Sequence, residues 1–373
     1  MTTTAQQTEA ATAVTTWLAE FSAALVANDP ARAAALFTED CFWRDLISFT
    51  WNFRTFEGRA EITRMLEATL SRGQPTGWAV TDGEEPAETD GITEAWINFE
   101  TSAGRGTRPP AAAPRPVRNW PVFSPKDKIA DWLESYTKVM ELNYWPGTEA
   151  KSASYNEASK EWTVNVERDG QAVVLRPKQL VLATGMSGKP TIPSFPGMDK
   201  FRGDQHHSSG HPGPDVYKGK QCVVIGSNNS AFDICGALWE SGADVTMVQR
   251  SSTHIVRSAT LMDIGLSALY SERAVASGVT TDKADLIFAS IPYRIMHQFQ
   301  IPLYDQMRER DKDFYDRLER AGFDHDWGDD GSGLFMKYLR RGSGYYIDVG
   351  AADLVANGDV KLVRGKAGSG TGA

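Results

Sequence analysis

Cysteine is scarce in this sequence of 373 residues, and long apolar runs and an excess of basic residues are missing. Its three cysteines, Cys41, Cys222 and Cys235, share no spacing typical of a metal or redox site, and so sparse a set fits a reducing compartment. No run of about 18 apolar residues occurs, so no transmembrane helix is expected. The N-terminus lacks the basic start and apolar core of a secretory signal. These absences favour a cytoplasmic protein.

Acidic residues outnumber basic ones, 48 against 39, for a net charge of -9. This balance argues against nucleic acid or an anionic membrane as the main partner. Hydrophobic residues make up 41% and charged residues 23%, which are ordinary values for a globular protein. The length is sufficient for two or three domains, at about 100–200 residues each.

The first hundred residues form one compositional block behind a short lead-in, residues 1–12, which we expect to be disordered. Within residues 13–103, two helical patterns are separated by a break at Asn28-Asp29-Pro30. An aromatic, strand-like stretch, a third amphipathic helix from Gly58 and a further strand near Trp96 follow. Helices followed by strands predict a small α+β domain.

Residues 104–118 contain four prolines and four arginines, and we expect an exposed linker. Beyond it, a Ser124-Pro125 start predicts an amphipathic helix. Next come two strands joined by an Arg-Asp-Gly turn, and then a buried strand that ends at Gly185. Residues 255–340 are mostly helical in pattern, and the glycine-rich residues 366–373 are expected to be a flexible tail.

Residues 219–251 have the pattern of a strand, a helix and a second strand. The turn between the first strand and the helix consists of Gly226, Ser227, Asn228, Asn229, Ser230 and Ala231. The glycine permits a tight turn, a small residue at 231 lets the helix approach the sheet, and the amides at the helix N-terminus would face a pyrophosphate. Asn228 replaces the usual middle glycine and tolerates positive φ better than most residues. The pattern predicts a dinucleotide site; the alternative is an α/β unit without a ligand.

The end of the second strand indicates which dinucleotide is bound. An NAD site carries an acid there for the ribose 2′-hydroxyl, whereas an arginine accommodates the 2′-phosphate of NADP. This sequence has Gln249-Arg250-Ser251-Ser252, so NADP is predicted.

Three motifs together resemble the flavin-containing monooxygenases, a family that includes the Baeyer–Villiger enzymes. They are "FRGDQHHSSGHP", "LATGMSGKPTIPSFPG" and the Gly226 unit, in the family's order over roughly residues 119–365. The resemblance implies Rossmann-type α/β domains, FAD and NADPH as cofactors, and oxygenation of a small organic substrate by O2 through a flavin C4a-hydroperoxide.

The family's functional residues carry over by position. The six residues from Gly226 to Ala231 would line the NADP pyrophosphate, and Arg250 with Ser251 would hold its 2′-phosphate. Phe201, Gly203 and His207 would form the linker between two dinucleotide domains, and Thr184 and Gly185 would lie near FAD. The resemblance assigns no catalytic residue and no metal ligand.

The chain departs from the family at the FAD site. Its only early G-x-G, from Gly104 to Gly106, runs into two prolines and cannot open a helix. The family's closing strand is also missing after Gly365. We therefore expect residues 119–200 to be a remnant of an FAD-binding domain, and residues 201–365 to be an NADP-binding Rossmann domain with a helical insertion.

The N-terminal block resembles the SnoaL-like branch of the NTF2-like fold, through "ALFTEDCFWRD" and "FEGRAEITRML". Some relatives pair a pocket acid with a histidine, and Asp45 is the corresponding acid. No histidine occurs in residues 1–205, which excludes such a pair within this block. We expect an accessory domain, with a homodimer as one arrangement, whose aromatic residues form core and pocket wall: Trp43, Phe49, Trp51, Phe53 and Phe56.

The leading hypothesis is an FAD- and NADPH-dependent monooxygenase of the N,N-dimethylaniline or Baeyer–Villiger type, impaired by loss of the FAD motif. The alternative is a non-catalytic NADP-binding or interaction protein derived from the same family. A disulfide reductase is disfavoured because the sequence has no C-x-x-C or C-x-x-x-x-C pair.

Overall fold

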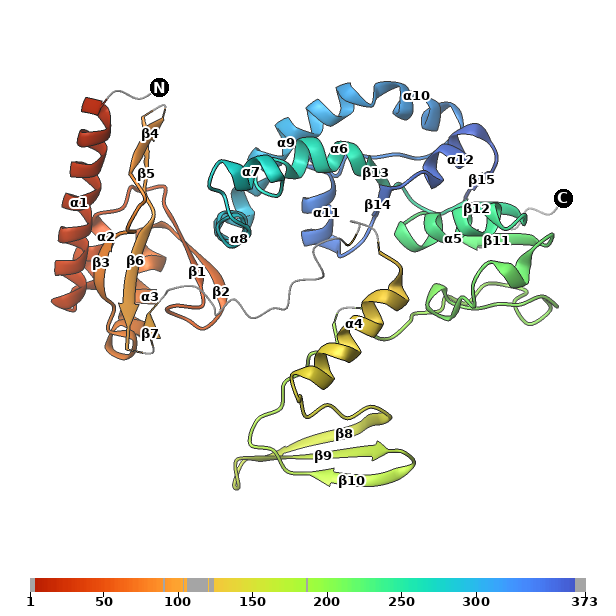
Figure 1. Cartoon of the computed structure of the whole chain (residues 1–373), viewed down its shortest axis with the longest axis horizontal. Helices are drawn as coiled ribbons and strands as arrows, with labels where there is room; N and C mark the ends of the chain where they lie inside the picture. The colour runs from red at the N-terminus through yellow and green to blue at the C-terminus, as the bar shows by residue number, and fades with distance from the viewer. Residues whose placement is uncertain are drawn as a thin grey trace. The chain divides into compact units, whose positions relative to one another are not determined.

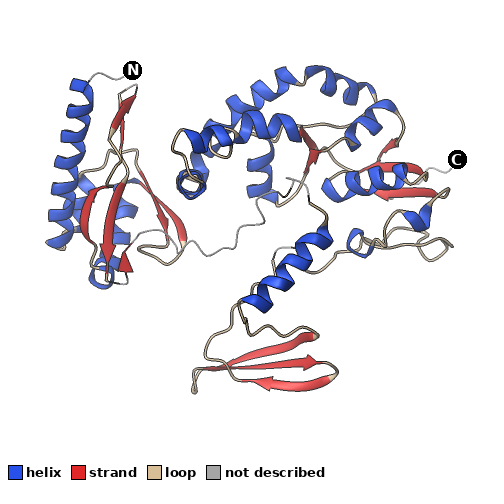
Figure 2. Ribbon diagram, in the orientation of Figure 1, coloured by secondary structure: helices blue, strands red, loops and turns tan. Residues whose placement is uncertain are grey.

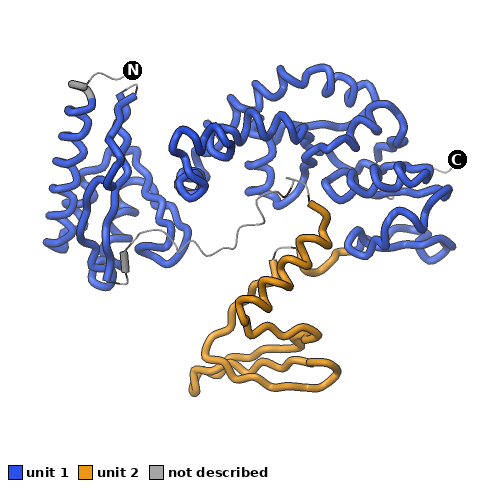
Figure 3. Tube along the Cα trace, in the orientation of Figure 1, with its two compact units in different colours: residues 1–108, 192–373 blue, residues 109–191 orange. Residues whose placement is uncertain are grey.

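The structure, a computed structural model, describes residues 4–89, 91–102, 104, 105, 120, 124–185 and 187–365. It contains two compact units, one of residues 1–108 with 192–373 and the other of residues 109–191 (Figure 3). The linker was expected over residues 104–118, but Gly104 and Arg105 form a short strand, because they pair with Thr101 and Glu100. Residues 106–118 and the expected tail at 366–373 lie outside the described residues.

The first unit begins with what we call the N-terminal module, the described part of residues 4–105 (Figure 1). Strands β1 and β2 form one antiparallel hairpin, β4 and β5 form another, and β3, β6 and β7 form an antiparallel sheet. The α+β class predicted for this block is confirmed. Its elements are α1 (Thr4–Val26), α2 (Pro30–Ala35), β1 (Phe42–Leu46), β2 (Phe53–Glu57), α3 (Gly58–Gly73), β3 (Thr76–Val80), β4 (Ala87–Thr89), β5 (Ile92–Glu94), β6 (Ile97–Thr101) and β7 (Gly104–Arg105).

The break between the first two helices has the predicted cause. Asp29 caps α2 by accepting a hydrogen bond from the backbone amide of Arg32 at 3.0 Å, and Pro30 occupies the first helical turn. The prediction of a disordered lead-in is wrong for residues 4–12, which belong to α1. Ala10 in this segment is only 2% exposed, because α1 packs on β3 and β4. Alanine favours helix, and tertiary contact stabilises this turn.

The N-terminal module has its own hydrophobic core, to which α1, α2, α3 and the β1–β2 hairpin contribute. Phe49 and Phe56 are buried and Trp43 packs against them, as predicted. The same prediction is wrong for Trp51 and Phe53, which are 65% and 70% exposed. These two residues lie in the bend after β1 and at the start of β2, at the tip of the hairpin.

The second unit consists of α4 (Lys126–Val139) and an antiparallel sheet of β8 (Thr148–Asn156), β9 (Glu161–Arg168) and β10 (Gln171–Leu175). The predicted helix and the Arg-Asp-Gly hairpin are confirmed. Both turn residues, Asp169 and Gly170, have positive φ, as a tight two-residue hairpin requires.

The prediction of a buried strand that ends at Gly185 is wrong. Residues 178–185 form no strand, and Val181 and Leu182 are 82% and 80% exposed. A central strand needs neighbours on both sides for its amides and carbonyls, and no described strand pairs with this segment.

The rest of the first unit, residues 192–365, is called the C-terminal body, and its α/β character is clear in Figure 2. Strands β11, β12 and β15 form a parallel sheet in that order, and β13 pairs in parallel with β14. Its elements are η1 (Ser208–Gly210), η2 (Asp215–Tyr217), β11 (Gln221–Ile225), α5 (Asn229–Glu240), β12 (Asp244–Gln249), β13 (His254–Arg257), α6 (Ser258–Thr260), the π-helix η3 (Leu261–Leu266), α7 (Glu272–Ala276), α8 (Thr281–Ser290), α9 (Tyr293–Arg310), α10 (Lys312–Arg320), α11 (Gly333–Arg341), β14 (Tyr345–Asp348), α12 (Ala351–Asn357) and β15 (Lys361–Arg364).

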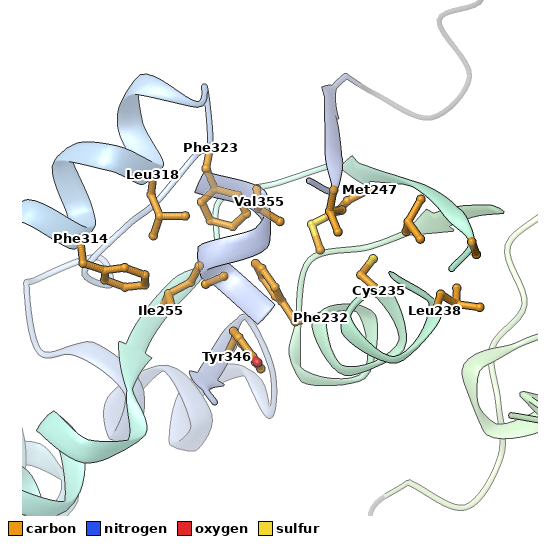
Figure 4. Close-up of a cluster of buried hydrophobic side chains, with 14 residues drawn as sticks. Phe232, Cys235, Leu238, Met247, Ile255, Phe314, Leu318, Phe323, Tyr346 and Val355 are labelled. Carbon is orange, nitrogen blue, oxygen red and sulfur yellow. The ribbon is translucent and has the colours of Figure 1, made fainter. Parts of the chain in front are cut away.

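The predicted strand–helix–strand unit is confirmed as β11–α5–β12, and its core fixes the position of α5. Phe232 is fully buried and stacks on Tyr346, with ring centroids 4.3 Å apart (Figure 4). Met247 of β12 and Val355 of α12 belong to the same buried cluster. This packing holds the N-terminus of α5 at the end of the sheet where β11, β12 and β15 finish.

Candidate dinucleotide-binding site

The turn from β11 into α5 depends on Gly226, whose φ of +137° is a conformation that residues with a side chain rarely adopt. Its amide donates to the carbonyl of Val248 at 3.0 Å, which holds the turn against β12. A Cβ built on Gly226 would lie 3.7 Å from the Cβ of Ala231. The glycine is therefore needed for its backbone conformation, while the small Ala231 lets α5 start close to the strand, as predicted.

Two side chains of the turn form hydrogen bonds within the protein and stabilise the fold. Ser227 is 5% exposed, and its hydroxyl lies 2.7 Å from the hydroxyl of Thr253, beyond β12. Asn229 accepts a hydrogen bond from the amide of Ile347 at 3.1 Å, which ties the helix start to β14. Asn228 and Ser230 are exposed.

Asn228 is the N-cap residue of α5, but its side chain makes no capping hydrogen bond. Its φ is -99°, so the tolerance of asparagine for positive φ, which the sequence suggested as its advantage here, is not used. The amides of the first turn of α5 consequently have no side-chain cap. Such a helix end can accept an anion.

The end of β12 carries the residues predicted to choose the dinucleotide. Arg250 and Ser251 are exposed, and Arg250 forms no hydrogen bond or ion pair with the described residues. Gln249, in contrast, is 2% exposed. Its side-chain amide donates to the carbonyl of Asp324 at 3.0 Å and accepts from the amide of Asp324 at 2.8 Å.

Sequence reasoning missed Asp324 and Arg364, which belong to the same region. Arg364, the last residue of β15, is in register with Gln249, and its guanidinium lies 3.1 Å from the carboxylate of Asp324. The run "DVKLVRG" predicted the strand. Nothing in the sequence indicated that residue 324, some 75 positions from β12, would join it.

The predicted linker residues occupy an irregular, mainly exposed segment. The ring of Phe201, 60% exposed, lies over Gly203, where a Cβ would approach it to 2.6 Å. His207 is the N-cap of η1 and accepts from the amide of Ser209 at 3.2 Å. The 3-10 helix η1 contacts α5.

The rings of His206, His211 and Tyr217 gather in this segment, and each is stacked on the other two at centroid distances of 5.5 to 6.0 Å. Burial, and then the charge of His206, lower the pKa of His211. A neutral His211 braces the segment through its ring contacts rather than supplying a proton.

The residues assigned to FAD do not form a site in the described structure. Thr184 and Gly185 lie on the exposed segment after β10, and Gly185 has a φ of +71°. They belong to the second unit, whereas the Gly226 turn belongs to the first.

Asp45 of the N-terminal module is buried but fully engaged. Its carboxylate accepts from the amides of Phe49 and Thr50 and from the hydroxyl of Thr50, at 2.6 to 3.2 Å. It therefore organises the bend after β1. Among the described residues no cluster of histidine, cysteine and acidic side chains could hold a metal ion. No described helix has the length and apolarity to cross a membrane.

Comparison with known proteins finds sequence similarity to one oxidoreductase family and to several monooxygenases. Residues 119–301 match the family described as pyridine nucleotide-disulphide oxidoreductase. The chain is 25% identical over 255 residues to a probable indole-3-pyruvate monooxygenase, YUCCA10 of Arabidopsis thaliana, and 28% identical over 145 residues to flavin-containing monooxygenase 3 of Macaca mulatta. These alignments cover 68% and 37% of this chain. In these segments the chain is similar in sequence to flavin monooxygenases.

The likeness to these flavin monooxygenases is partial. The chain spans 58% of the length of the Arabidopsis protein and 27% of the macaque one. A cyclohexanone monooxygenase solved with ε-caprolactone shares 19% identity at a TM-score of 0.43, over 64% of this chain and 52% of the other. The family match includes the Gly226 turn and Arg250 but stops before Asp324 and Arg364.

Proposed function

We propose that the C-terminal body binds NADPH through the Gly226 turn and the end of β12. The observation that carries this proposal is the uncapped N-terminus of α5, which follows a glycine at φ +137° directly after a parallel strand. A pyrophosphate there would lie along residues 226–231 and would receive hydrogen bonds from the backbone amides between Ser227 and Ser230, because the amides of Gly226 and Ala231 already donate to the carbonyls of Val248 and Asn228. The helix dipole would add favourable charge. Ser227 and Asn229 would hold the turn in shape, since their side chains are already bonded within the protein.

Arg250 supports NADPH rather than NADH. It follows β12 directly, is exposed, and has no partner among the described residues, so its guanidinium is available to a 2′-phosphate. Ser251 is its exposed neighbour and would add a hydroxyl donor. The position of an acid in an NAD site is taken by Gln249, which is buried and committed to Asp324.

We further propose that the chain is an FAD- and NADPH-dependent monooxygenase that acts with O2 on a small organic substrate. Its relatives' names support this class. FAD would supply the oxygen chemistry. The described residues expected beside FAD, Thr184 and Gly185, do not assemble a dinucleotide turn, so we expect the chain to hold FAD weakly.

For the N-terminal module we propose an NTF2-like accessory domain, as a homodimer. The order of helices, hairpin and sheet supports this, as does a core separate from that of the C-terminal body. Asp45 has a structural role in this domain, because its carboxylate is saturated by local donors.

The monooxygenase proposal is tested by titrating the purified chain with FAD and recording NADPH-dependent O2 consumption with FAD in excess. We expect weak flavin binding and slow oxidation that rises with the concentration of FAD. NADPH oxidation that never responds to FAD would contradict the flavin-dependent activity. Protein that is purified with tightly bound flavin and turns over rapidly would show that the FAD site is complete.

A further inference from the structure

The end of the parallel sheet carries an ion pair beside the proposed 2′-phosphate site. Arg364 of β15 is in register with Gln249 of β12, and the amide of Gly365 donates to the carbonyl of Gln249 at 3.2 Å. Paired strands lie about 4.8 Å apart, so Arg364 ends its strand one spacing from the residue that precedes Arg250. The two arginines therefore leave the sheet at the same edge.

Asp324 is fixed at this edge by its backbone. The buried side chain of Gln249 binds both the amide and the carbonyl of Asp324, and the amide of Thr253 donates to the same carbonyl at 3.0 Å. Hydrogen bonds from Gln249 and Thr253, the residues just before and just after the Arg250–Ser252 turn, therefore hold the backbone of Asp324 in place. The carboxylate of Asp324 pairs with the guanidinium of Arg364 at 3.1 Å. The side chain of Asp324 is 42% exposed and that of Arg364 is 54% exposed.

Asp324 is chemically the acid that an NAD site would use. Asp324 lies beside the end of β12, although it belongs to the segment after α10, and Arg364 neutralises its carboxylate. A free carboxylate there would accept a hydrogen bond from a ribose 2′-hydroxyl and repel a 2′-phosphate, which carries about -1.5 to -2 charges at neutral pH.

We propose that the Asp324–Arg364 pair sets the selectivity of this site between NADPH and NADH. Arg364 neutralises the acid and adds a second guanidinium for the 2′-phosphate, and Asp324 limits how strongly that guanidinium acts. This inference rests on the proposed NADPH site, and it predicts opposite effects for the two partners.

Removing Arg364 and removing the charge of Asp324 should shift the ratio of NADPH to NADH affinity in opposite directions. Arg364→Ala removes a cation and exposes the Asp324 carboxylate, so NADPH should bind about 5-fold more weakly and NADH no more weakly. Asp324→Asn keeps the backbone bonds to Gln249 and frees Arg364, so NADPH should bind about 3- to 5-fold more tightly.

A matched control exists on the same strand. Lys361 begins β15 and pairs with Asp244 at 2.7 Å, at the opposite end of the sheet. Lys361→Ala removes a comparable exposed ion pair and one positive charge, and it should leave the ratio of NADPH to NADH affinity unchanged.

Affinities of the full chain and its variants are measured by calorimetric titration with NADPH and NADH, and with 2′,5′-ADP and 5′-AMP to isolate the 2′-phosphate. Opposite shifts in Arg364→Ala and Asp324→Asn, with Lys361→Ala unchanged, are the expected result. If the parent prefers NADPH and Arg250→Ala erodes that preference, but both new variants keep the parental ratio, the inference is wrong and the proposed site stands. A parent chain with no preference, or no binding, overturns both. Should Arg364→Ala fail to fold, Asp324→Asn alone decides, since a ratio that is unchanged or shifted toward NADH refutes the inference.

Discussion

Placing an acid at the end of β12 is the obvious way to convert the proposed site to NADH, and the structure predicts that Gln249→Glu will fail. Gln249 is 2% exposed, and its side-chain amide is bonded to the backbone amide and carbonyl of Asp324. A glutamate there would still accept from the amide of Asp324. Its second oxygen would face the carbonyl of Asp324, where the glutamine now donates.

The cost can be estimated from these contacts. An ionised carboxylate opposite a carbonyl in a buried position is avoided by protonation, which restores the donor. Holding a glutamic acid neutral at pH 7, against an ordinary pKa near 4.3, costs about 4 kcal/mol at about 1.4 kcal/mol per pH unit. Because the folded-state pKa is raised, the penalty should shrink by about 1.4 kcal/mol for each unit of pH below 7, until it vanishes near pH 4.

The assay is urea unfolding of Gln249→Glu and the parent chain at pH 7 and pH 5, with NADH titration at pH 7. Gln249→Leu is the uncharged control. It leaves the backbone amide of Asp324 without an acceptor, while the carbonyl of Asp324 still accepts from the amide of Thr253. It should lower the free energy of unfolding by about 1–3 kcal/mol at both pH values. Arg250→Glu, an exposed acid one residue later, should fold normally and weaken NADPH binding. A Gln249→Glu protein as stable as its parent at pH 7, with improved NADH affinity, would refute the placement of residue 249.

Three other results are expected. Arg250→Ala should reduce the preference for NADPH by roughly 1–3 kcal/mol in calorimetric titration without lowering the melting temperature, because the side chain is exposed; an intact preference would remove Arg250 from the site. Phe232→Ala should lower the free energy of unfolding by about 3–5 kcal/mol, whereas Val223→Ala, 64% exposed, should change it by less than about 0.5 kcal/mol; similar urea midpoints would contradict the core assignment. Burial lowers the pKa of His254 to about 3 and of His325 to about 4, so the unfolded chain binds protons that the folded chain does not, and stability should fall by about 2 kcal/mol per histidine between pH 6.5 and 5. His325→Gln should lose one histidine's share of that dependence, and a variant with the parent's full pH dependence would contradict it.

The sequence was most informative where short-range rules determine structure. The β11–α5–β12 unit was predictable, because a glycine turn, an amphipathic helix and two apolar strands lie within about 30 residues. The helix break at Asp29-Pro30 and the Arg-Asp-Gly hairpin were predictable for the same reason: capping and turn chemistry act over a few residues.

Prediction failed where a residue's environment comes from distant segments. Val181 and Leu182 have the composition of a buried strand, but burial requires neighbouring strands, and the described structure supplies none. Nothing in the sequence shows that the side-chain amide of Gln249, at the end of β12, binds the backbone of Asp324, 75 positions away. The pairing of Asp324 with Arg364 depends on the same long-range register and leaves no sequence pattern.

The central claim, that the Gly226 turn and Arg250 form an NADPH site, is tested most directly by calorimetric titration of the full chain with NADPH and NADH in parallel. The account predicts that NADPH binds at least about tenfold more tightly, as a guanidinium bonded to a 2′-phosphate implies. Equal affinities, or no binding of either nucleotide, would contradict it.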